Sequence, residues 1–293
     1  MASPRPGPSS PASPGVDRFP GDPGPGRLYV GTSVRGDVPV SFAATGDLRI
    51  TMTRRYYRRG EAWRLIKMAA QDSRAGLLPL VSLKPPGRWI DVAEGRHDDL
   101  LSWMLGRLAD IARPVFLAVQ HEPENEVSSR QMPRDWVAMQ HHVIEMAQRI
   151  SPQVTVVPIL MQYTFDPASG RTPERWLVPG AAVQGIDLYN PWRPGRAVAW
   201  VDFATMLERA RAVIGDGPVV VPEFGCHTDR HDLARTRQWF RDAFEYAVHH
   251  DVVGMAYFDS PHSDDGQSWV LDAVRRRAMQ EITHRPRVVD LRR

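Results

Sequence analysis

Eight short apolar runs recur along this chain at nearly constant spacing, and this repeat restricts the possible folds more than any other feature. The runs have the apolar, β-rich composition of strands, and longer stretches with the apolar spacing of helices lie between them, less clearly after the second and eighth runs. The runs are LYVGTS from 28, RITMT from 49, LLPLVSL from 77, PVFLAVQ from 114, VTVVPIL from 154, VQGIDLY from 183, PVVVPEF from 218 and VVGMAYF from 252. Seven steps cover the 224 residues from 28 to 252, or 32 residues a step, close to the ~31 of an eight-unit barrel. The sequence therefore predicts one α/β domain, a single (β/α)8 TIM barrel.

Two of the intervening segments show the helical pattern clearly. DDLLSWMLGRLADIA from Asp98 and PRDWVAMQHHVIEMAQRI from Pro133 carry apolar residues three and four positions apart, and proline suits a first helical turn. A doubly wound open sheet is the structural alternative, but the glycine-rich fingerprint of its dinucleotide-binding version does not follow the first strand. We expect the barrel to span residues 27–285 and a short tail to follow over residues 286–293.

The first 26 residues differ from the rest in composition. MASPRPGPSSPASPGVDRFPGDPGPG is rich in proline, serine and glycine and offers almost nothing to bury, so we expect a disordered arm over residues 1–26. The arm lacks the apolar region of a secretory signal, and no later stretch approaches the ~20 apolar residues of a membrane span. The expected location is the cytoplasm by default, unless the true start of the protein lies upstream.

Charge and cysteine content exclude several classes of function. The formal net charge is only +3 and the basic residues are scattered, so neither a nucleic-acid partner nor a membrane partner is indicated. The densest basic cluster, Arg54, Arg55, Arg58 and Arg59, is too short to change this. Cys226 is the only cysteine, which rules out an intrachain disulfide and a thiolate zinc site. With 42% hydrophobic residues, the chain can bury a large core, and we expect a monomer.

Acidic residues stand where two of the expected strands end. PVFLAVQ is followed directly by His121 and Glu122, and PVVVPEF delivers Glu223. The two glutamates are 101 residues apart, about three repeats, so Glu122 ends the fourth strand and Glu223 the seventh. Because the carboxyl ends of barrel strands meet at one mouth, the two should face each other, as the paired carboxylates of glycoside hydrolysis do. Glu124 and Glu126 are better interpreted as solvated loop carboxylates.

Three motifs, QHEPEN, GIDLYN and PEFG, resemble those of clan A glycoside hydrolases, the retaining (β/α)8 enzymes. A histidine before the first glutamate is the feature that most resembles glycoside hydrolase family 26, the mannanase family. The resemblance in architecture extends over residues 28 to about 283. The resemblance implies that Glu122 is the acid/base, that Glu223 is the nucleophile, that His121 binds sugar in the −1 subsite and that Tyr189 hydrogen-bonds the nucleophile. Such a hydroxyl would keep Glu223 ionised, whereas Glu122 must carry a proton to deliver. A strand-end histidine satisfied by a neighbouring strand is the alternative for His121.

The chain also departs from the family pattern. After Glu122 it continues PENEVSSRQMP, without the glycine and aromatic residues that family 26 mannanases usually carry, which weakens the case for mannan. The eighth strand ends MAYFDS, without the tryptophan that often floors the −1 subsite in this clan, so Tyr257 or Phe258 would take its place. Trp192 and Trp89, on expected mouth loops, are candidates for stacking on a sugar ring, with loop packing as the alternative.

Two basic residues also fall near the expected mouth. Lys84 stands at the end of the third run, and Arg54 stands at the end of the second. Each could reach substrate hydroxyls or instead pair with a catalytic carboxylate, where a positive charge favours ionisation. Cys226, next to PEFG, is better interpreted as a packed thiol than as a reactive one.

Two other functions remain open for the same barrel. One is a metal-dependent hydrolase, because a carboxylate and histidine set stands at or near strand ends: His121, Glu122, Asp187, Glu223 and His227. Against it, the first strand continues GTSVRGD without the His-x-His of metal-dependent amidohydrolase barrels. The other is a non-catalytic carbohydrate-binding barrel. The favoured hypothesis is a retaining glycosidase that needs no cofactor and acts on a β-linked oligo- or polysaccharide by double displacement.

Overall fold

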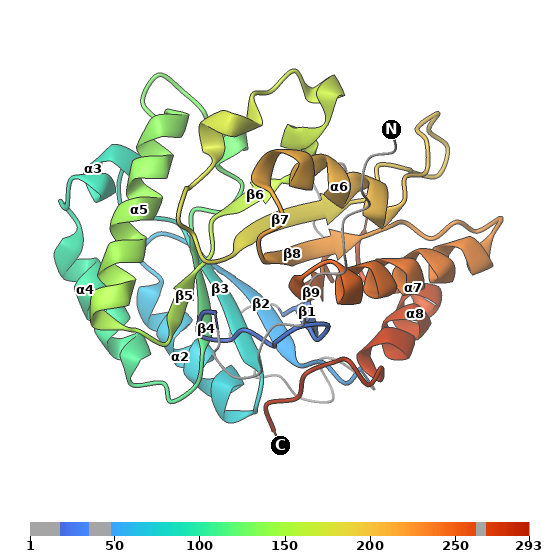
Figure 1. The fold of residues 1–293 in the computed structure, drawn as a ribbon, viewed down its shortest axis with the longest axis horizontal. Coiled ribbons are helices and arrows are strands. Elements are labelled where there is room, and N and C mark those ends of the chain that lie inside the picture. Colours follow the sequence, from blue (N-terminus) through green and yellow to red (C-terminus); the bar gives the residue numbers. More distant parts are fainter. Residues whose placement is uncertain (1–17, 35–47, 262–267, 293) are drawn as a thin grey trace, which may run out of the picture.

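The computed structural model describes residues 18–34, 48–261 and 268–292, and a ring of parallel strands forms the centre of the molecule (Figure 1). The strands are β1 (Tyr29–Ser33), β2 (Met52–Tyr57), β3 (Leu78–Leu83), β4 (Val115–Val119), β5 (Val154–Val156), β6 (Ile159–Met161), β7 (Gln184–Tyr189), β8 (Val219–Gly225) and β9 (Val252–Tyr257). They pair in the order β5-β4-β3-β2-β1-β9-β8-β7-β6. The eight predicted runs are all strands, and the (β/α)8 fold is confirmed.

The ninth strand arises because the fifth predicted run is divided in two. β5 pairs with β4 and β6 pairs with β7, and only Val157 and Pro158 separate them. Proline has no N–H to donate to a strand ladder, which explains the break at this point. Backbone bonds continue across it, since Val157 N donates to Leu117 O and Gly185 N donates to Pro158 O. The barrel therefore closes through this divided strand, and the open-sheet alternative is wrong.

Helices cover the outside of the ring, with α2 to α5 on one side in Figure 1 and α6 to α8 on the other. Their bounds are α2 (Ala62–Arg74), α3 (Trp89–Ala93), α4 (Asp98–Ala109), α5 (Pro133–Ile150), α6 (Phe203–Ile214), α7 (Leu233–His249) and α8 (Ala273–Thr283). Short 3-10 turns lie in the loops at η1 (Pro123–Asn125), η2 (Gln162–Phe165), η3 (Pro167–Ser169) and η4 (Pro173–Trp176). No helix within the described ranges is long and apolar enough to cross a membrane.

The strands are apolar on both faces because each face is buried. In β4, Val115, Leu117 and Val119 belong to the core between sheet and helices, whereas Phe116 and Ala118 belong to the core inside the barrel. This alternation follows from the two-residue period of a strand. It explains why the strands read as continuous apolar runs, as buried parallel strands generally do.

Both described ends of the chain close the barrel at the face opposite the strands' carboxyl ends. Phe19 is only 5% exposed, belongs to the inner core and lies with its ring 6.2 Å from that of Phe116. Val289 joins the same core, and Leu28 bridges to Val288. The predicted disordered arm is thus wrong for residues 18–26, because Phe19 gives this segment something to bury; residues 1–17 lie outside the described residues. The tail after residue 285 likewise packs against the barrel.

The second strand is longer than the sequence suggested, and this changes what it presents. β2 runs from Met52 to Tyr57, so Arg54 lies within the strand and Tyr56 lies nearer the mouth. Alternate side chains face opposite ways, and neighbouring Arg55 pairs behind the sheet with Asp72 through bonds of 2.7 and 2.8 Å. Arg54 therefore points to the barrel interior, beneath the mouth rather than at the end of the strand.

Candidate active site

The turn after β4 presents the first glutamate in an uncommon backbone conformation. Gln120 and Glu122 have φ values of 57° and 48°, in the left-handed region that non-glycine residues rarely adopt. Glu122 N donates to Ile159 O at 3.0 Å, which ties the turn to β6. Two such residues cost about 1–3 kcal/mol each and persist only where surrounding structure holds them, as often happens at functional sites. The turn brings the carboxylate of Glu122 over the barrel mouth.

The second glutamate lies near the end of β8 and is held on both oxygens. Glu223 is 6% exposed. The hydroxyl of Tyr189, the last residue of β7, donates to its Oε2 at 2.6 Å. Nη2 of Arg54 donates to its Oε1 at 3.4 Å. The sequence left two roles open for Arg54, contact with substrate hydroxyls or pairing with a catalytic carboxylate. The structure shows the pairing with Glu223. Both carboxyl oxygens of Glu223 therefore have a donor on another strand.

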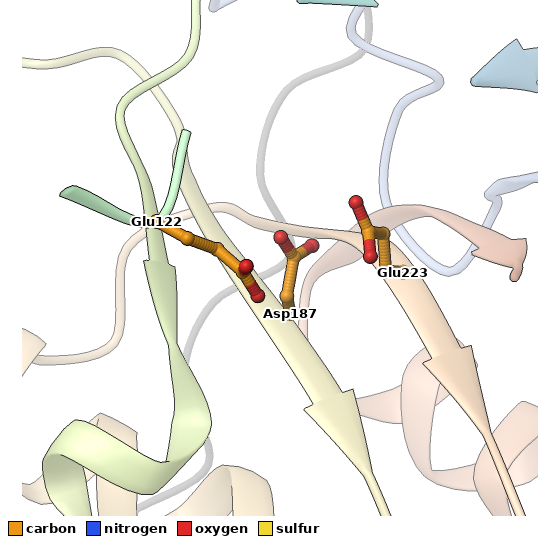
Figure 2. Close-up of side chains that lie close together, drawn as sticks. All are labelled: Glu122, Asp187 and Glu223. Carbon is orange, nitrogen blue, oxygen red and sulfur yellow. The ribbon is translucent and has the colours of Figure 1, made fainter. Parts of the chain in front are cut away.

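Three carboxyl groups meet at the mouth: Glu122, Asp187 and Glu223 each place one oxygen within 4.8 Å of the others. Figure 2 shows Asp187 between the two glutamates, projecting from β7. Asp187 is 3% exposed, and neither of its carboxyl oxygens has a hydrogen-bond partner among the described residues. Burial, followed by the charges of Glu223 and Glu122, raises the pKa of Asp187 well above its usual range. The environment therefore favours a neutral Asp187 between two glutamates.

Arg54 is the buried positive charge of this site. It is fully buried, donates to the hydroxyl of Ser82 at 2.5 Å and lies 4.3 Å from the ring centre of Tyr56. The ring face and the hydroxyl orient the guanidinium toward Glu223. Burial, then the nearby Glu223 carboxylate, raises the pKa of Tyr56 well above its usual range, so Tyr56 is a neutral hydroxyl beside the site.

His121 lies among the same groups. Its ring centre is 5.5 Å from that of Tyr56. Burial, then the charges of Arg54 and Lys84, lowers the pKa of His121 well below its usual range. Its Nδ1 is buried without a hydrogen-bond partner in the part of the chain that the structure describes. A neutral imidazole with an unused nitrogen is available to bind a hydroxyl group, which fits its predicted role better than the alternative of a histidine satisfied by a neighbouring strand.

Aromatic rings form one wall of the mouth. Phe258, directly after β9, meets Tyr56 and Tyr189 edge to face at 6.2 and 5.9 Å. Trp269, from the loop that follows, has its ring centre 4.8 Å from that of Tyr189. The wall also includes Gly225, where an added Cβ would lie 3.1 Å from the Trp269 ring. Glycine at this end of β8 thus permits the tryptophan to lie close to the strand.

Several residues predicted to bind substrate lie elsewhere. Trp89 is fully buried in α3 with its ring 6.3 Å from that of Trp176, so it is a core residue and no stacking platform. Tyr257 is fully buried and donates to Trp269 O at 2.8 Å, because inside and outside alternate along β9 and Phe258 takes the mouth position. Trp192 is half-buried, and its ring centre lies 5.4 Å from that of Trp200, which fits the alternative of loop packing. Stacking of Trp192 on a sugar ring stays a prediction.

The remaining charged residues near Glu122 lie at the rim or below it. Lys84 pairs with Glu126 at 2.6 Å and with neither catalytic candidate. Glu124 is not the solvated carboxylate that was expected: it is 7% exposed, and its Oε1 accepts from Met161 N and from the Thr164 hydroxyl, both at 2.9 Å. The turn at Pro123 directs it inward, to the loop after β6.

Sequence reasoning missed Tyr56 and Trp269 and gave Asp187 a role only as a metal ligand. Tyr56 could have been found from the alternation in MTRRYY, which puts Met52, Arg54 and Tyr56 on one face. Asp187 precedes Tyr189 by two residues and shares its face of the strand. Trp269 had no local signal, since it follows β9 by a loop whose path the sequence does not reveal.

The residues at the mouth meet only part of what the alternative of a metal-dependent hydrolase requires. The three carboxyl groups are close enough to hold a cation, but among the described residues neither His121 nor His227 belongs to that group. Arg54 and the Tyr189 hydroxyl already bond the two oxygens of Glu223. A fixed guanidinium repels a cation at this point, so the donor set suits a protonated carboxyl better than a metal ion.

Solved structures of similar fold include several glycoside hydrolases. A modular endo-β-1,4-mannanase of family 26 from Cellulomonas fimi is 14% identical, with a TM-score of 0.58 over 94% of this chain and 74% of that one. The catalytic domain of a family 26 endo-β-1,4-mannanase from Bacillus sp. JAMB-750 is 12% identical, with a TM-score of 0.60 over 91% and 88%. Thermotoga maritima Cel5A, solved with mannotriose, is 14% identical, with a TM-score of 0.59 over 90% and 99%. No protein-family model and no curated protein matches the chain.

Proposed function

We propose that this protein is a retaining glycoside hydrolase that cleaves β-linked oligo- or polysaccharides. The observation that carries the proposal is the pair Glu122 and Glu223, whose oxygens approach within 4.8 Å while Tyr189 and Arg54 hold Glu223. Retaining glycosidases have carboxyl groups about 5–5.5 Å apart, whereas inverting enzymes need about 6.5–9.5 Å to admit a water molecule. The close approach favours retention.

The two glutamates then divide the chemistry by their surroundings. Glu223, oriented by a hydroxyl and a guanidinium that donate to it, is the nucleophile that attacks the anomeric carbon. Glu122, at the more open rim of the turn, gives its proton to the departing glycosidic oxygen. A covalent glycosyl-enzyme results. In the second step Glu122 removes a proton from water, which attacks the same carbon and releases the sugar with its original configuration.

The groups around the pair are suited to contact a sugar. A neutral Asp187 adds no third negative charge between the two glutamates and leaves a hydrogen-bond donor in the centre of the site. The neutral ring of His121 offers a second polar contact. Phe258 is half-buried and presents ring surface beside them, as sugar recognition requires, since a pyranose has an apolar C–H face, and the buried Trp269 packs behind Tyr189.

The test is a screen of purified protein against β-linked polysaccharides and aryl β-glycosides, with Glu122→Ala and Glu223→Ala beside the wild type. Both variants should lose hydrolysis, and azide should restore the Glu223→Ala reaction as a glycosyl azide of inverted configuration. Glu126→Ala is the matched control, because Glu126 lies four residues from Glu122 but pairs at the rim with Lys84. Activity that survives in either glutamate variant would remove the assignment. Oligosaccharide binding without turnover by the wild type would indicate a non-catalytic barrel instead.

A further inference from the structure

A cavity of about 230 Å³ lies beside the candidate active site, and the proposed hydrolysis makes no use of it. Its walls come from the loop after β4 and the loop after β6, both at the carboxyl ends of the strands, on the side of the barrel that carries Glu122. Glu124, in the same turn as Glu122, lines it. A glycan that extends from Glu122 toward the loop after β6 would reach this cavity.

Two arginines line the cavity, and their side chains differ in how firmly they are held. Arg171 donates to the Thr164 hydroxyl at 3.0 Å and to Asn125 Oδ1 at 3.2 Å, and it lies 5.4 Å from the ring centre of Tyr163. The side chain of Arg175 is exposed and makes no hydrogen bond or ion pair within the described part of the chain. One guanidinium is thus fixed in place, and the other has all its donors available.

Carboxyl groups are scarce on the described part of the cavity wall. The only carboxyl group of the described lining is that of Glu124, which is buried and accepts from Met161 N and Thr164. Burial raises the pKa of Glu124, while its hydrogen bonds and the nearby charge of Arg171 act in the opposite direction. Pro133, the first residue of the 18-residue helix α5, also lines the cavity, so the start of that helix borders the same space, with Asp135 in its first turn accepting from Met132 N.

We propose that this cavity is a subsite for an anionic group of the glycan, a uronic acid carboxylate or a sulfate ester, bound by Arg175 with Arg171. The planar fork of a guanidinium matches the oxygens of such groups, and the resulting charge-assisted bonds are among the stronger ones in proteins. This inference rests on the proposed function and narrows its substrate class to acidic β-linked glycans. It also accounts for the lack of aromatic residues in PENEVSSRQMP, where a neutral glycan would be held by stacking.

The test measures binding, so that its failure is separate from a failure of the proposed hydrolysis. The probes are neutral β-1,4-linked gluco- and manno-hexasaccharides, their C6-oxidised uronate counterparts and their 6-O-sulfated counterparts. Affinity is measured by calorimetry with the full chain carrying Glu223→Gln, which prevents turnover. We expect the preferred anionic form to bind about tenfold more tightly than its neutral counterpart, which corresponds to one charge-assisted bond. Uronate and sulfate arms identify which anion fits.

Two arginine variants complete the design. Arg175→Gln should abolish the preference for the anionic form. Arg134→Gln removes the same charge from a side chain that is 86% exposed at the start of α5 but does not line the cavity, so the preference should persist. Equal affinity for neutral and anionic forms, a preference that survives Arg175→Gln, or no binding of any probe would overturn the subsite. None of these results would bear on the roles of Glu122 and Glu223, which the hydrolysis screen tests separately.

Discussion

The bond from the Tyr189 hydroxyl to Glu223 offers the sharpest test of the catalytic geometry. Tyr189→Phe removes one oxygen, and with it a 2.6 Å bond to Oε2, while Arg54 still donates to Oε1 at 3.4 Å. A hydrogen bond to a charged group contributes about 1.5–3 kcal/mol. Since about 1.4 kcal/mol is a tenfold change in rate, kcat/KM should fall roughly 10- to 150-fold if the bond is made in the transition state. The ring itself keeps its contacts with Trp269 and Phe258.

The assay is steady-state hydrolysis of the best aryl β-glycoside found in the screen, together with thermal unfolding to show that the variant is folded. Tyr246→Phe is the matched control, because it also removes a tyrosine hydroxyl bonded to a glutamate, Glu208, but on the outer helices. It should leave kcat/KM unchanged. If Tyr189→Phe stays within twofold of the wild type, the claim that this hydroxyl stabilises the working form of Glu223 is refuted.

Three further predictions concern stability. Asp187→Asn should stabilise the fold at pH 7. The pKa of Asp187 is raised in the folded state, so the wild type has its full stability below the unfolded pKa of about 3.9. It loses some of that stability as pH rises above this value, because the carboxyl group then ionises more easily in the unfolded chain than in the folded one. Urea unfolding at pH 3 and 7 checks this, since an equal difference between variant and wild type at both would contradict it. Phe19→Ala should cost about 3–5 kcal/mol through lost packing with Phe116, and a loss below about 1 kcal/mol would mean that the segment does not close the barrel. Asp72→Asn should cost about 3–5 kcal/mol because it leaves Arg55 buried without its partner, and an unchanged unfolding midpoint would contradict this.

The pattern of the barrel was accessible from local sequence. Each strand run begins within three residues of the observed strand, because apolar composition and turn residues act over short distances. The second run is the largest difference: Arg54, Arg55 and the two tyrosines at 56 and 57 look like a polar end, yet they continue β2. Burial of Arg55 against Asp72 and of Arg54 against Glu223 allows charged residues inside a strand, and those partners are 17 and 169 residues away.

The assembly of the site could be anticipated only where position on a strand sufficed. Glu122 and Glu223 follow from counting repeats, because parallel strands in a barrel bring their carboxyl ends to one mouth. Trp89 could not be placed in this way: whether a loop residue faces the mouth or the core depends on the course of the loop, and here α3 turns it against Trp176.

The number of repeating units and the edge of the barrel where two glutamates meet could be predicted from the sequence, since both depend on periodicity and strand direction alone. The tertiary structure was needed to choose ion pairing with Glu223 for Arg54 and to bring Trp269 against Tyr189, because these residues come from different units. It also decided the ionisation of Asp187, whose pKa depends on burial and on charges brought close by other strands. Contacts between distant units carry no local signal in the chain, and they exist only once the barrel has closed.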